Sequence, residues 1–541
     1  MKQSNSLFNR SGLVGIAFSV IATVFGVTSC QTDYDLDKHF PEWLGTSIFE
    51  TLSDGFEVDS GKVYKFDTFV RLIQDLDQEK ILAKTGSKTL FVADDAAFAR
   101  FFGDNCPFKK ADGTPVRSYD ELSIAQKTMI LKGAMLNNVY QVAMLSSSEG
   151  PKLGDCMRRL SSSSVYDTIP VLLGKDMPDS PLWSYLKNDP ERSKAGIPIM
   201  QDGTIKPLIF FVNKFLTTHR ITDDDYDFLF NQGNYGSKPS RKANDASVNG
   251  VRIEYQNKKC FNGFIHVMED VVYLLPSMAE YLEHSDNSII YSSILERFSA
   301  PFYPTGAQQG VTSGKTHKDD VKRLIEDGKA GGAALEAAMK ASDDTVYTKM
   351  YFSKRAQGNT KWNKTPTGKT FGYDAQLLKF DPGWNSFFSE TSSTTTTDVA
   401  LQQNMAVMLV PTDETLTKWW LYEGGKALRE RYGLDEFKDN PPTTPQEVAR
   451  DMSNIDISVI VKLNNNNKLN SLTGSVPSKF SNVLNDANDP MFEDPALALS
   501  QMEKVVMCCN GAIYFTNAVY APTAYRSVSY PALVNEKLEV F

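Results

Sequence analysis

The feature that most constrains this chain is a short segment near its middle that returns near its end. Residues 248–275 carry two Asn-Gly pairs, Asn249-Gly250 and Asn262-Gly263. Each pair favours a tight turn, because glycine reaches positive φ at no steric cost. The segment therefore predicts two turns with a strand between them.

The stretches around the second turn differ in how they distribute apolar side chains. Residues 251–255 alternate apolar with polar side chains, which predicts a strand with one buried face. Residues 264–275 are almost continuously apolar, which suits a strand covered on both faces. Together they predict a hairpin that closes a buried sheet.

Residues 502–522 repeat this pattern without a gap and place Asn510-Gly511 over the second Asn-Gly pair. Apolar and turn positions recur, whereas polar positions change: His266 corresponds to Tyr514. A catalytic imidazole would have to survive duplication, while a packing position needs only volume. We therefore expect two related units, and we expect His266 to be a core or sheet-edge residue.

Length and charge narrow the class of protein. At 541 residues the chain is too long for one ordinary domain, and its 41% hydrophobic content is that of a folded globular protein. The formal net charge is −9, and loss of residues 1–29, with Lys2 and Arg10, would make it −11. Nucleic-acid binding depends on basic patches, so this balance argues against a nucleic-acid partner.

The amino terminus predicts export. Residues 1–29 combine a basic start with an apolar run too short for a comfortable membrane span, as a signal peptide does. The run ends in Val-Thr-Ser-Cys, which resembles the lipobox of bacterial lipoproteins and implies lipidation of Cys30. Residues 30–42 form an acidic tether similar to the surface-export signal of Bacteroidetes lipoproteins. These resemblances imply a lipid anchor in the outer membrane and exposure on the cell surface. The alternative is an ordinary secreted protein with a chance cysteine.

The other cysteines are odd in number and lack CxxC spacing, so they predict neither a disulfide framework nor a zinc site. Two of them lie just before Asn-Gly pairs, which suggests small buried apolar residues. The set consists of Cys106, Cys156, Cys260, Cys508 and Cys509.

A short helix is expected to open each unit. Residues 47–52 read SIFETL, and related patterns return at residues 293–298 and 536–541. Each pattern follows the tether or a buried hairpin, so we expect a unit to begin with this helix and to end with the hairpin. The chain would then stop as a third unit starts, or its last helix would cap the second unit.

A strand followed by a helix is also predicted twice. Residues 89–98 read TLFVADDAAF and residues 407–416 read VMLVPTDETL, with residues that cap helices between strand and helix. Residues 125–136 and 457–463 form a looser pair, and each runs into asparagines. Residues 66–76 predict an amphipathic helix.

These motifs resemble those of fasciclin-like domains. TLFVADDAAF and VMLVPTDETL are similar to the first signature, typically TVFAPTNEAF, and FNGFIHVMEDVVYLL is similar to the second. The resemblance implies an α+β fold with two tandem β-wedge domains and packed helices, at residues 43–276 and 285–523. Residues 524–541 would be the start of a third repeat or a C-terminal cap. Both units exceed the usual size, which implies long insertions around residues 146–242 and 300–402.

The resemblance also carries a functional expectation. Fasciclin-like domains are mainly extracellular adhesion or interaction modules without a cofactor, which implies a protein that is not an enzyme. Their Tyr-His pair, linked to integrin adhesion in animal members, is absent, since residues 132–138 read KGAMLNN and residues 462–468 read KLNNNNK. Integrin-type binding is therefore not expected.

Other patterns fail in detail as chemical sites. Residues 310–316 and 368–370 lack the first glycine of a phosphate loop. Asp223, Asp225 and Asp227 begin like a calcium loop but lack its glycine and its final glutamate, so we interpret them as a solvated acidic turn.

Two threonines, Thr168 and Thr345, lie in Asp-Thr-Ile and Asp-Thr-Val sequences that resemble the short O-glycosylation motif of Bacteroidetes. Tryptophans in or near the insertions are candidate anchors for a ligand, although core packing is expected for the last two of the set. The set is Trp183, Trp362, Trp384, Trp419 and Trp420.

Three functions remain open. The first is a surface-exposed lipoprotein that binds a protein or a glycan through its insertions. The second is an accessory subunit of a TonB-dependent nutrient-transport complex, with an outer-membrane β-barrel as its partner. The third, a glycan-active enzyme, would require two carboxylates that face each other in a cleft lined by the insertions.

Overall fold

The structure is a computed structural model. It describes residues 45–84, 86–110, 112–145, 157–161, 169–200, 206–230, 244–302, 332–343, 345–351, 378, 405–434, 442–469, 471–485 and 488–522. The predicted signal peptide, tether and third repeat lie outside these residues, as do both phosphate-loop-like sequences. Among the described helices, none combines the length and apolarity needed to cross a membrane.

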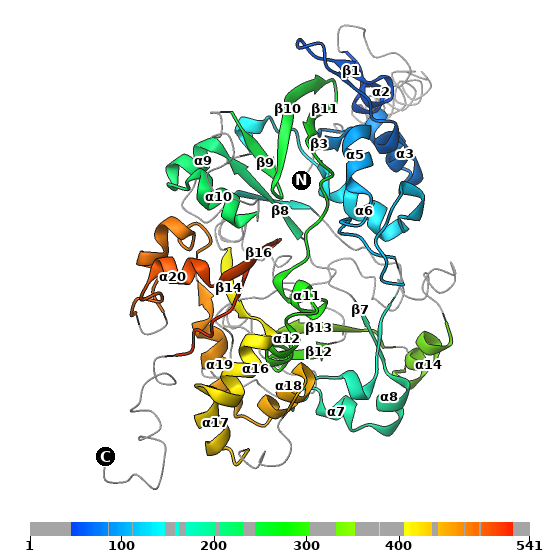
Figure 1. The fold of residues 1–541 in the computed structure, drawn as a ribbon. Helices are drawn as coiled ribbons and strands as arrows, with labels where there is room; N and C mark the ends of the chain where they lie inside the picture. The colour runs from blue at the N-terminus through cyan, green and yellow to red at the C-terminus, as the bar shows by residue number, and fades with distance from the viewer. Residues whose placement is uncertain are drawn as a thin grey trace, which may run out of the picture.

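The first unit is built on a curled sheet (Figure 1). Within the described residues this sheet has seven strands in the order β4-β3-β11-β10-β9-β8-β5. β3 and β11 are parallel, and the other described neighbours for which a register is known are antiparallel. The bounds are β3 (Lys88–Ala93), β4 (Met135–Leu136), β5 (Met157–Ser161), β8 (Lys206–Val212), β9 (Ala246–Val248), β10 (Val251–Cys260) and β11 (Gly263–Met268).

The predicted turn and hairpin are both present. Asn249 and Gly250 have φ of 49° and 85° and connect β9 to β10, with Val248 paired to Val251 across the turn. β10 and β11 pair as antiparallel neighbours, as expected for the closing hairpin.

The strand after the second turn is shorter than predicted. Of the apolar stretch at residues 264–275, only the part up to Met268 belongs to β11. Glu269 and Asp270 are exposed, and the Asp270 carboxylate accepts a hydrogen bond from the backbone N–H of Val271. This polar pair ends the strand, and the chain leaves the sheet there.

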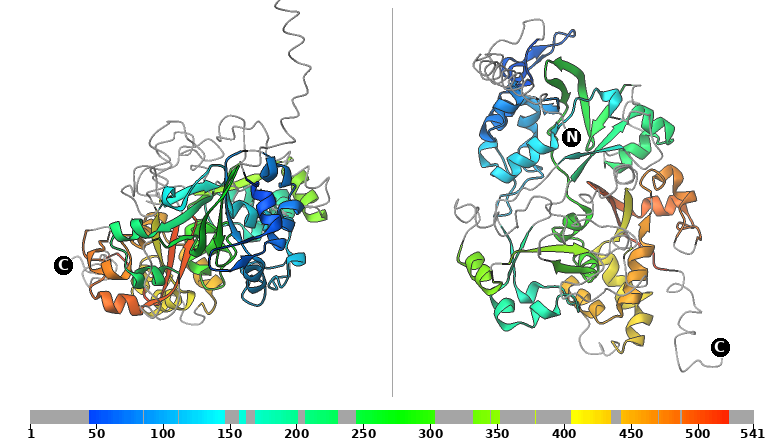
Figure 2. Two further views of the ribbon diagram at one scale, coloured as in Figure 1. Left: turned by 90° about the horizontal axis from the view of Figure 1, so that it is seen from above. Right: turned by 180° about the vertical axis from the view of Figure 1, so that it is seen from behind.

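Helices pack on the sheet of the first unit and enclose its core (Figures 1 and 2). Leu90, Phe98 and Ile265 are fully buried between them and the central strands. The predicted amphipathic helix is α3. The helices and the small outer hairpin are α2 (Ile48–Asp54), β1 (Phe56–Glu57), β2 (Val63–Tyr64), α3 (Asp67–Asp75), α4 (Glu79–Lys84), α5 (Asp95–Phe101), α6 (Ile124–Gly133), α9 (Asn213–Thr218) and α10 (Asp223–Leu229).

The second unit repeats the central part of this arrangement. As far as it is described, its sheet has the order β15-β14-β17-β16, again with a central parallel pair. The strands are β14 (Ala406–Pro411), β15 (Lys468–Leu469), β16 (Met502–Cys508) and β17 (Gly511–Thr516). The helices are α11 (Met278–Glu283), α12 (Ile289–Glu296), α16 (Asp413–Tyr422), α17 (Gly425–Arg431), α18 (Pro445–Ser453), α19 (Ile457–Asn466) and α20 (Pro495–Ser500).

The strand registers confirm the repeat residue by residue. Gly263 lies opposite Lys88 at the start of one parallel pair, and Gly511 lies opposite Ala406 at the start of the other. In each unit a helix follows the first strand of the parallel pair. Further along the chain, β4 follows α6 and pairs antiparallel with β3, and β15 follows α19 and pairs antiparallel with β14. The predicted fold class, α+β with two tandem units, is therefore confirmed.

The helix that opens the second unit is not the predicted one. α2 and α11 both begin with a Ser-x-x-Glu capping box, with Ser47 and Ser277 as N-caps. Residues 293–298, the predicted counterpart, lie at the end of α12, which corresponds to α3. The prediction was wrong because α12 carries the same serine, apolar and glutamate spacing. The second unit therefore begins at Ser277, ahead of the predicted boundary at residue 285.

Parts of the two insertions pair with each other. In the portions that are described, they form a further sheet in the order β12-β13-β7-β6, with β7 and β13 parallel. We call residues 169–200, 299–302, 332–343 and 345–351 the composite module. Its elements are β6 (Val171–Leu172), α7 (Ser184–Lys187), α8 (Pro190–Ala195), β7 (Ile197–Met200), β12 (Ser299–Phe302), α14 (Ala333–Ala341) and β13 (Tyr347–Tyr351).

The two units also touch directly through one continuous apolar core. This core includes Phe210 from the first unit and Val407 from the second. Phe228 of α10 packs edge-on against Tyr514 of β17, with ring centroids 5.0 Å apart, and against Phe480 at 6.2 Å. The tandem units are therefore packed against each other.

Candidate functional site

The asparagine of the repeated Asn-Gly pair performs the same task in both units. The Asn262 side-chain oxygen accepts a hydrogen bond from the backbone N–H of Ile48 at 2.9 Å, and that of Asn510 accepts one from Met278 at 2.9 Å. These N–H groups open α2 and α11 and have no partner within their own helices. The Asn262 amide also donates to the carbonyl oxygen of Leu82 at 2.7 Å. The recurring asparagine is a cap that ties the closing hairpin to the opening helix.

The glycine after each asparagine recurs because there is no room for a side chain. A Cβ on Gly263 would lie 1.9 Å from the carbonyl oxygen of Lys88, and one on Gly511 would lie 2.3 Å from that of Ala406. Gly263 has φ of 155°, whereas Gly511 does not have a positive φ. Close approach of the paired strand therefore explains why this glycine recurs in both units. The positive φ predicted at the second Asn-Gly pair is present at Gly263 as well.

A second repeated polar contact was missed from the sequence. Asp94 caps its own helix α5, as predicted, through the backbone N–H of Ala97. Asp95 instead accepts bonds of 2.8 and 3.0 Å from the first N–H groups of α3. Its counterpart Asp413 accepts bonds of 2.8 and 2.9 Å from the first N–H groups of α12. Burial raises the pKa of Asp413, and these two backbone bonds oppose that rise. A signal was present in the sequence, because the second acidic position recurs while the first does not.

His266, the histidine of the motif, is fully buried in β11. Its Nδ1 accepts a hydrogen bond from the backbone N–H of Asn257 at 3.0 Å, so Nε2 carries the proton that bonds the Tyr140 carbonyl oxygen at 3.0 Å. The ring of Phe91 stacks on it at 5.4 Å. Burial lowers the pKa of His266 to about 4, against the opposing effect of the Tyr140 carbonyl. The imidazole is therefore a neutral core residue, like Tyr514 in the second unit.

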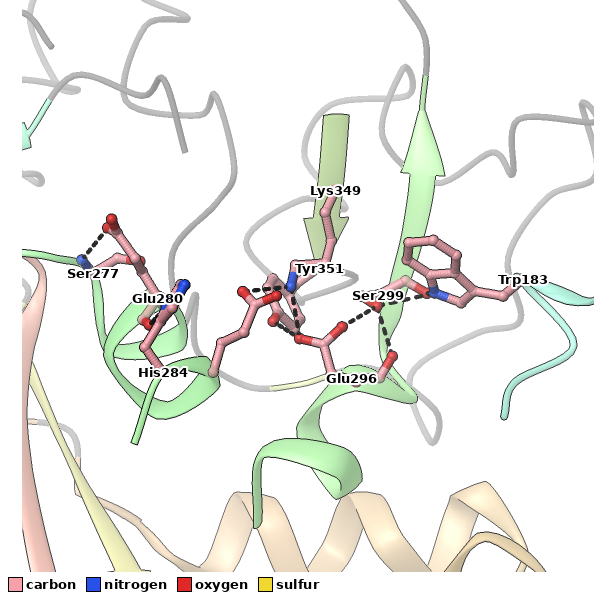
Figure 3. Close-up of polar contacts among 9 residues, drawn as sticks. Trp183, Ser277, Glu280, His284, Glu296, Ser299, Lys349 and Tyr351 are labelled. Carbon is pink, nitrogen blue, oxygen red and sulfur yellow. Dashed lines mark hydrogen bonds and ion pairs between the residues drawn. The ribbon is translucent and has the colours of Figure 1, made fainter. Parts of the chain in front are cut away.

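At the edge of the composite module, the buried Lys349 forms ion pairs with two carboxylates, those of Glu283 and Glu296 (Figure 3). The Lys349 Nζ of β13 lies 2.8 Å from the Glu283 carboxylate and 3.1 Å from that of Glu296. The Lys349 side chain is 5% exposed, and those of Glu296 and Glu283 are 15% and 39% exposed. The Tyr351 hydroxyl also donates to Glu296.

The chemistry of this cluster is that of an ion-pair lock. Burial alone would lower the pKa of Lys349, but the Glu296 and Glu283 carboxylates outweigh it and raise that pKa. A glycosidase pair instead needs one carboxyl group held protonated opposite a second that faces the sugar. Here the two carboxylates share a cation, and the cluster ties β13 to the C-terminal ends of α11 and α12.

Another buried lysine joins the two units. Lys206, at the start of β8, pairs with Glu280 of α11, and its side chain is 5% exposed. Glu280 is also the capping-box glutamate of α11 and accepts from the backbone N–H of Ser277 at 3.2 Å. The capping box of the second unit is therefore also an attachment point for the first.

The acidic run is a helix, not the predicted solvated turn. Asp225 lies in α10 and is 1% exposed. Its carboxylate accepts from the backbone N–H of Ser478 at 2.9 Å and from the hydroxyl of Ser478 at 2.7 Å. Ser478 belongs to the short helix η9 (Pro477–Asn482) of the second unit, so Asp225 is an interface residue. Among the residues that the structure describes, no group of three or more His, Cys, Asp or Glu side chains could hold a metal ion.

The described cysteines are buried, with free thiols, and burial raises the pKa of the thiols of Cys106, Cys260 and Cys508. They are Cys106, Cys260, Cys508 and Cys509. Cys30, the predicted lipidation site, and Cys156 lie outside the described residues.

The tryptophans that the structure describes are buried, so they are not surface anchors. Trp183 and Trp420 are 0% exposed and Trp419 is 4% exposed. Trp362 and Trp384 lie outside the described residues. Of the two candidate glycosylation sites, Thr345 is half-buried just before β13, and Thr168 is not among the described residues.

Neither a protein-family model nor a curated protein matches the chain. Among solved structures, the chain is similar to a FAS1 domain pair from the insect cell adhesion molecule fasciclin I. The sequence identity is 8% and the TM-score is 0.21, and the match covers 85% of this chain and 97% of that chain.

Proposed function

We propose that the protein is a non-enzymatic interaction module of fasciclin-like type, anchored to the outer membrane through lipidated Cys30 and exposed on the cell surface. Its ligand is a protein or a glycan. The observation that carries the proposal is the use of the repeated polar residues. Asn262 and Asn510 cap opening helices, and Asp95 and Asp413 cap the next helices.

The candidate catalytic groups support the same conclusion. His266 is neutral and enclosed, and the carboxylates of Glu283 and Glu296 share Lys349. The described parts of the insertions, by contrast, lie outside the strands and helices that recur in both units. We assign ligand contact to the insertions.

The anchor is tested by Cys30→Ser in the native organism. We expect the wild-type chain to incorporate labelled fatty acid and to sediment with outer membranes, and the variant to lose both properties. Protease treatment of intact cells should degrade the wild-type protein if its body faces outward. Full protection of the chain in intact cells would contradict surface exposure.

The partner is tested by affinity purification of the tagged, lipidated protein from native outer membranes, with Cys30→Ser as the control. Recovery of a secreted protein or a glycan supports the interaction module. Stable recovery of an outer-membrane β-barrel favours the alternative function, an accessory subunit of a TonB-dependent nutrient-transport complex. Hydrolysis of a glycan by the purified protein would overturn both.

A further inference from the structure

The two units are joined at three places that lie apart from one another. The first is the covalent link, where the chain runs from β11 to α11 through residues 269–277 and the Lys206–Glu280 ion pair lies beside it. The second is the direct contact of α10 with β17 and η9. The third is the composite module. In Figure 1, α11 lies near the centre, with α10 and α20 to one side and β7, β13 and α14 to the other.

Within the described residues, neither half of the composite module supplies more than two paired strands to its sheet. The first unit supplies β6 and β7, joined through two residue pairs, and the second supplies β12 and β13, joined through four. An isolated two-stranded hairpin is at best marginally stable in water. The parallel contact of β7 with β13, which pairs Tyr347 with Ile199, joins the two strand pairs into one sheet.

Side chains join the halves as well. Trp183, 0% exposed, donates from Nε1 to the carbonyl oxygen of Ser299 at 3.0 Å and to its hydroxyl at 3.1 Å (Figure 3). Tyr347 of the second unit completes the apolar cluster around Trp183, Leu186 and Ile197 of the first. Each half therefore covers apolar surface that the other would leave exposed.

Each half is also fixed to its own unit. The first half leaves the first unit after β5 and returns at β8, and these two strands pair along five residues of the large sheet. The second half is held on α11 and α12 by Lys349, which binds Glu283 and Glu296. A continuous set of contacts thus runs from the sheet of one unit, through the module, to the helices of the other.

We propose that the composite module is a brace that suppresses hinge motion between the two units. A covalent link with one contact beside it leaves an axis about which tandem units can swing. A second contact on the other side of the link removes that axis. The two units then form one rigid body, and a ligand that spans both meets a surface that needs no domain rearrangement.

The test measures the distance between the units in the full chain. Spin labels are introduced through a non-canonical amino acid at Val63 and Tyr422, which are 56% and 73% exposed and lie outside the module. Double electron–electron resonance should give one narrow distance distribution for the otherwise unchanged chain. Trp183→Ala, and separately Lys349→Ala, should broaden that distribution at least twofold.

The matched control is Trp420→Ala. Trp420 is also 0% exposed and also donates its indole N–H, to Asp451 at 2.6 Å, but within the second unit. This variant should lower stability and leave the width of the distribution unchanged. Hydrogen exchange, followed by mass spectrometry, reports whether a substitution opens the module: exchange should rise together in residues 169–200 and 299–302 and stay slow in β11 and β17.

Three results would overturn the proposal. One is a module that opens by hydrogen exchange while the distance distribution stays as narrow as in the unchanged chain. Another is a distribution that is already broad without any substitution. The third is unchanged exchange in the Trp183→Ala/Lys349→Ala double variant, because the contacts named here would then not hold the brace.

Discussion

The two units share a frame, which consists of the parallel strand pair, the closing hairpin and the helices that these strands position. They differ in the elements around this frame. In each, a closing hairpin supplies an asparagine to the opening helix, and an aspartate after the first strand holds the next helix. These contacts join elements far apart in the sequence, and they recur. The comparison shows that duplication retained the polar groups that set how the elements meet.

Polar contacts elsewhere have diverged. In the first unit, Lys127 of α6 pairs with Asp75 of α3 at 2.6 Å. The corresponding positions in the second unit are Ile460 and Arg297, and Arg297 instead bonds backbone carbonyl oxygens near the end of α18. The ion pair between α6 and α3 is therefore not kept in the second unit, whereas the asparagine of the closing hairpin caps the opening helix in both units.

The strongest test of the shared frame is to remove the close approach of its strands. Gly511→Ala and Gly263→Ala each place a Cβ within 2.3 Å or less of a backbone oxygen. We expect each to lower the free energy of unfolding by about 3 kcal/mol, with the larger loss for Gly263→Ala, because its Cβ would be closest. Chemical denaturation measures both losses.

Gly433→Ala is the control for backbone strain without crowding. Gly433 has φ of 67°, and a Cβ there meets nothing within 4 Å. We expect a loss of about 1 kcal/mol. If Gly511→Ala lowered the free energy of unfolding by no more than Gly433→Ala does, close approach would not explain why the glycine recurs.

A smaller difference between the two units is expected in how the free energy of unfolding depends on pH. The folded pKa of His266 is about 4, below the unfolded value of 6.5, so its neutral form stabilises the fold above pH 6.5. That contribution, at most about 3 kcal/mol, is lost as the pH falls from 6.5 through 4. Tyr514, in the same place in the second unit, does not gain a proton over this range. His266→Gln should therefore flatten the dependence of unfolding free energy on pH in this window.

The control for this measurement is His284→Gln, since His284 is exposed and lies outside the sheets. Equal slopes for His266→Gln and the unchanged chain between pH 6.5 and 4 would show that His266 is not the group that takes up the proton.

The sequence predicted the frame better than the surroundings, for physical reasons. Strand pairing and turn positions follow from local patterns, so the hairpins, the Asn249-Gly250 turn and the α+β class were predicted. The roles of Asn262 and Asp95 depend on helices distant in sequence, so their recurrence in the second unit marks them, whereas no local pattern does. The opening helix of the second unit was misplaced because two helices carry the same spacing of serine and glutamate. The composite module was not predicted, because its pairing joins residues about 150 positions apart, as Ile199 and Tyr347 are.

The smallest expected effect is at a core position that is apolar in the first unit and polar in the second. Asn464 of α19 is 0% exposed, and neither atom of its amide has a hydrogen-bond partner among the residues the structure describes. Its counterpart in α6 is Leu131, 3% exposed within the apolar core of the first unit. An unpartnered buried amide destabilises a fold, so Asn464→Leu should raise the free energy of unfolding by about 1 kcal/mol. The reverse change, Leu131→Asn, should lower it by about 3 kcal/mol, because it buries a new amide and removes apolar contact. Denaturation of both variants measures the pair, and a loss of stability in Asn464→Leu would mean that this asparagine, like Asn510, holds a contact the second unit requires.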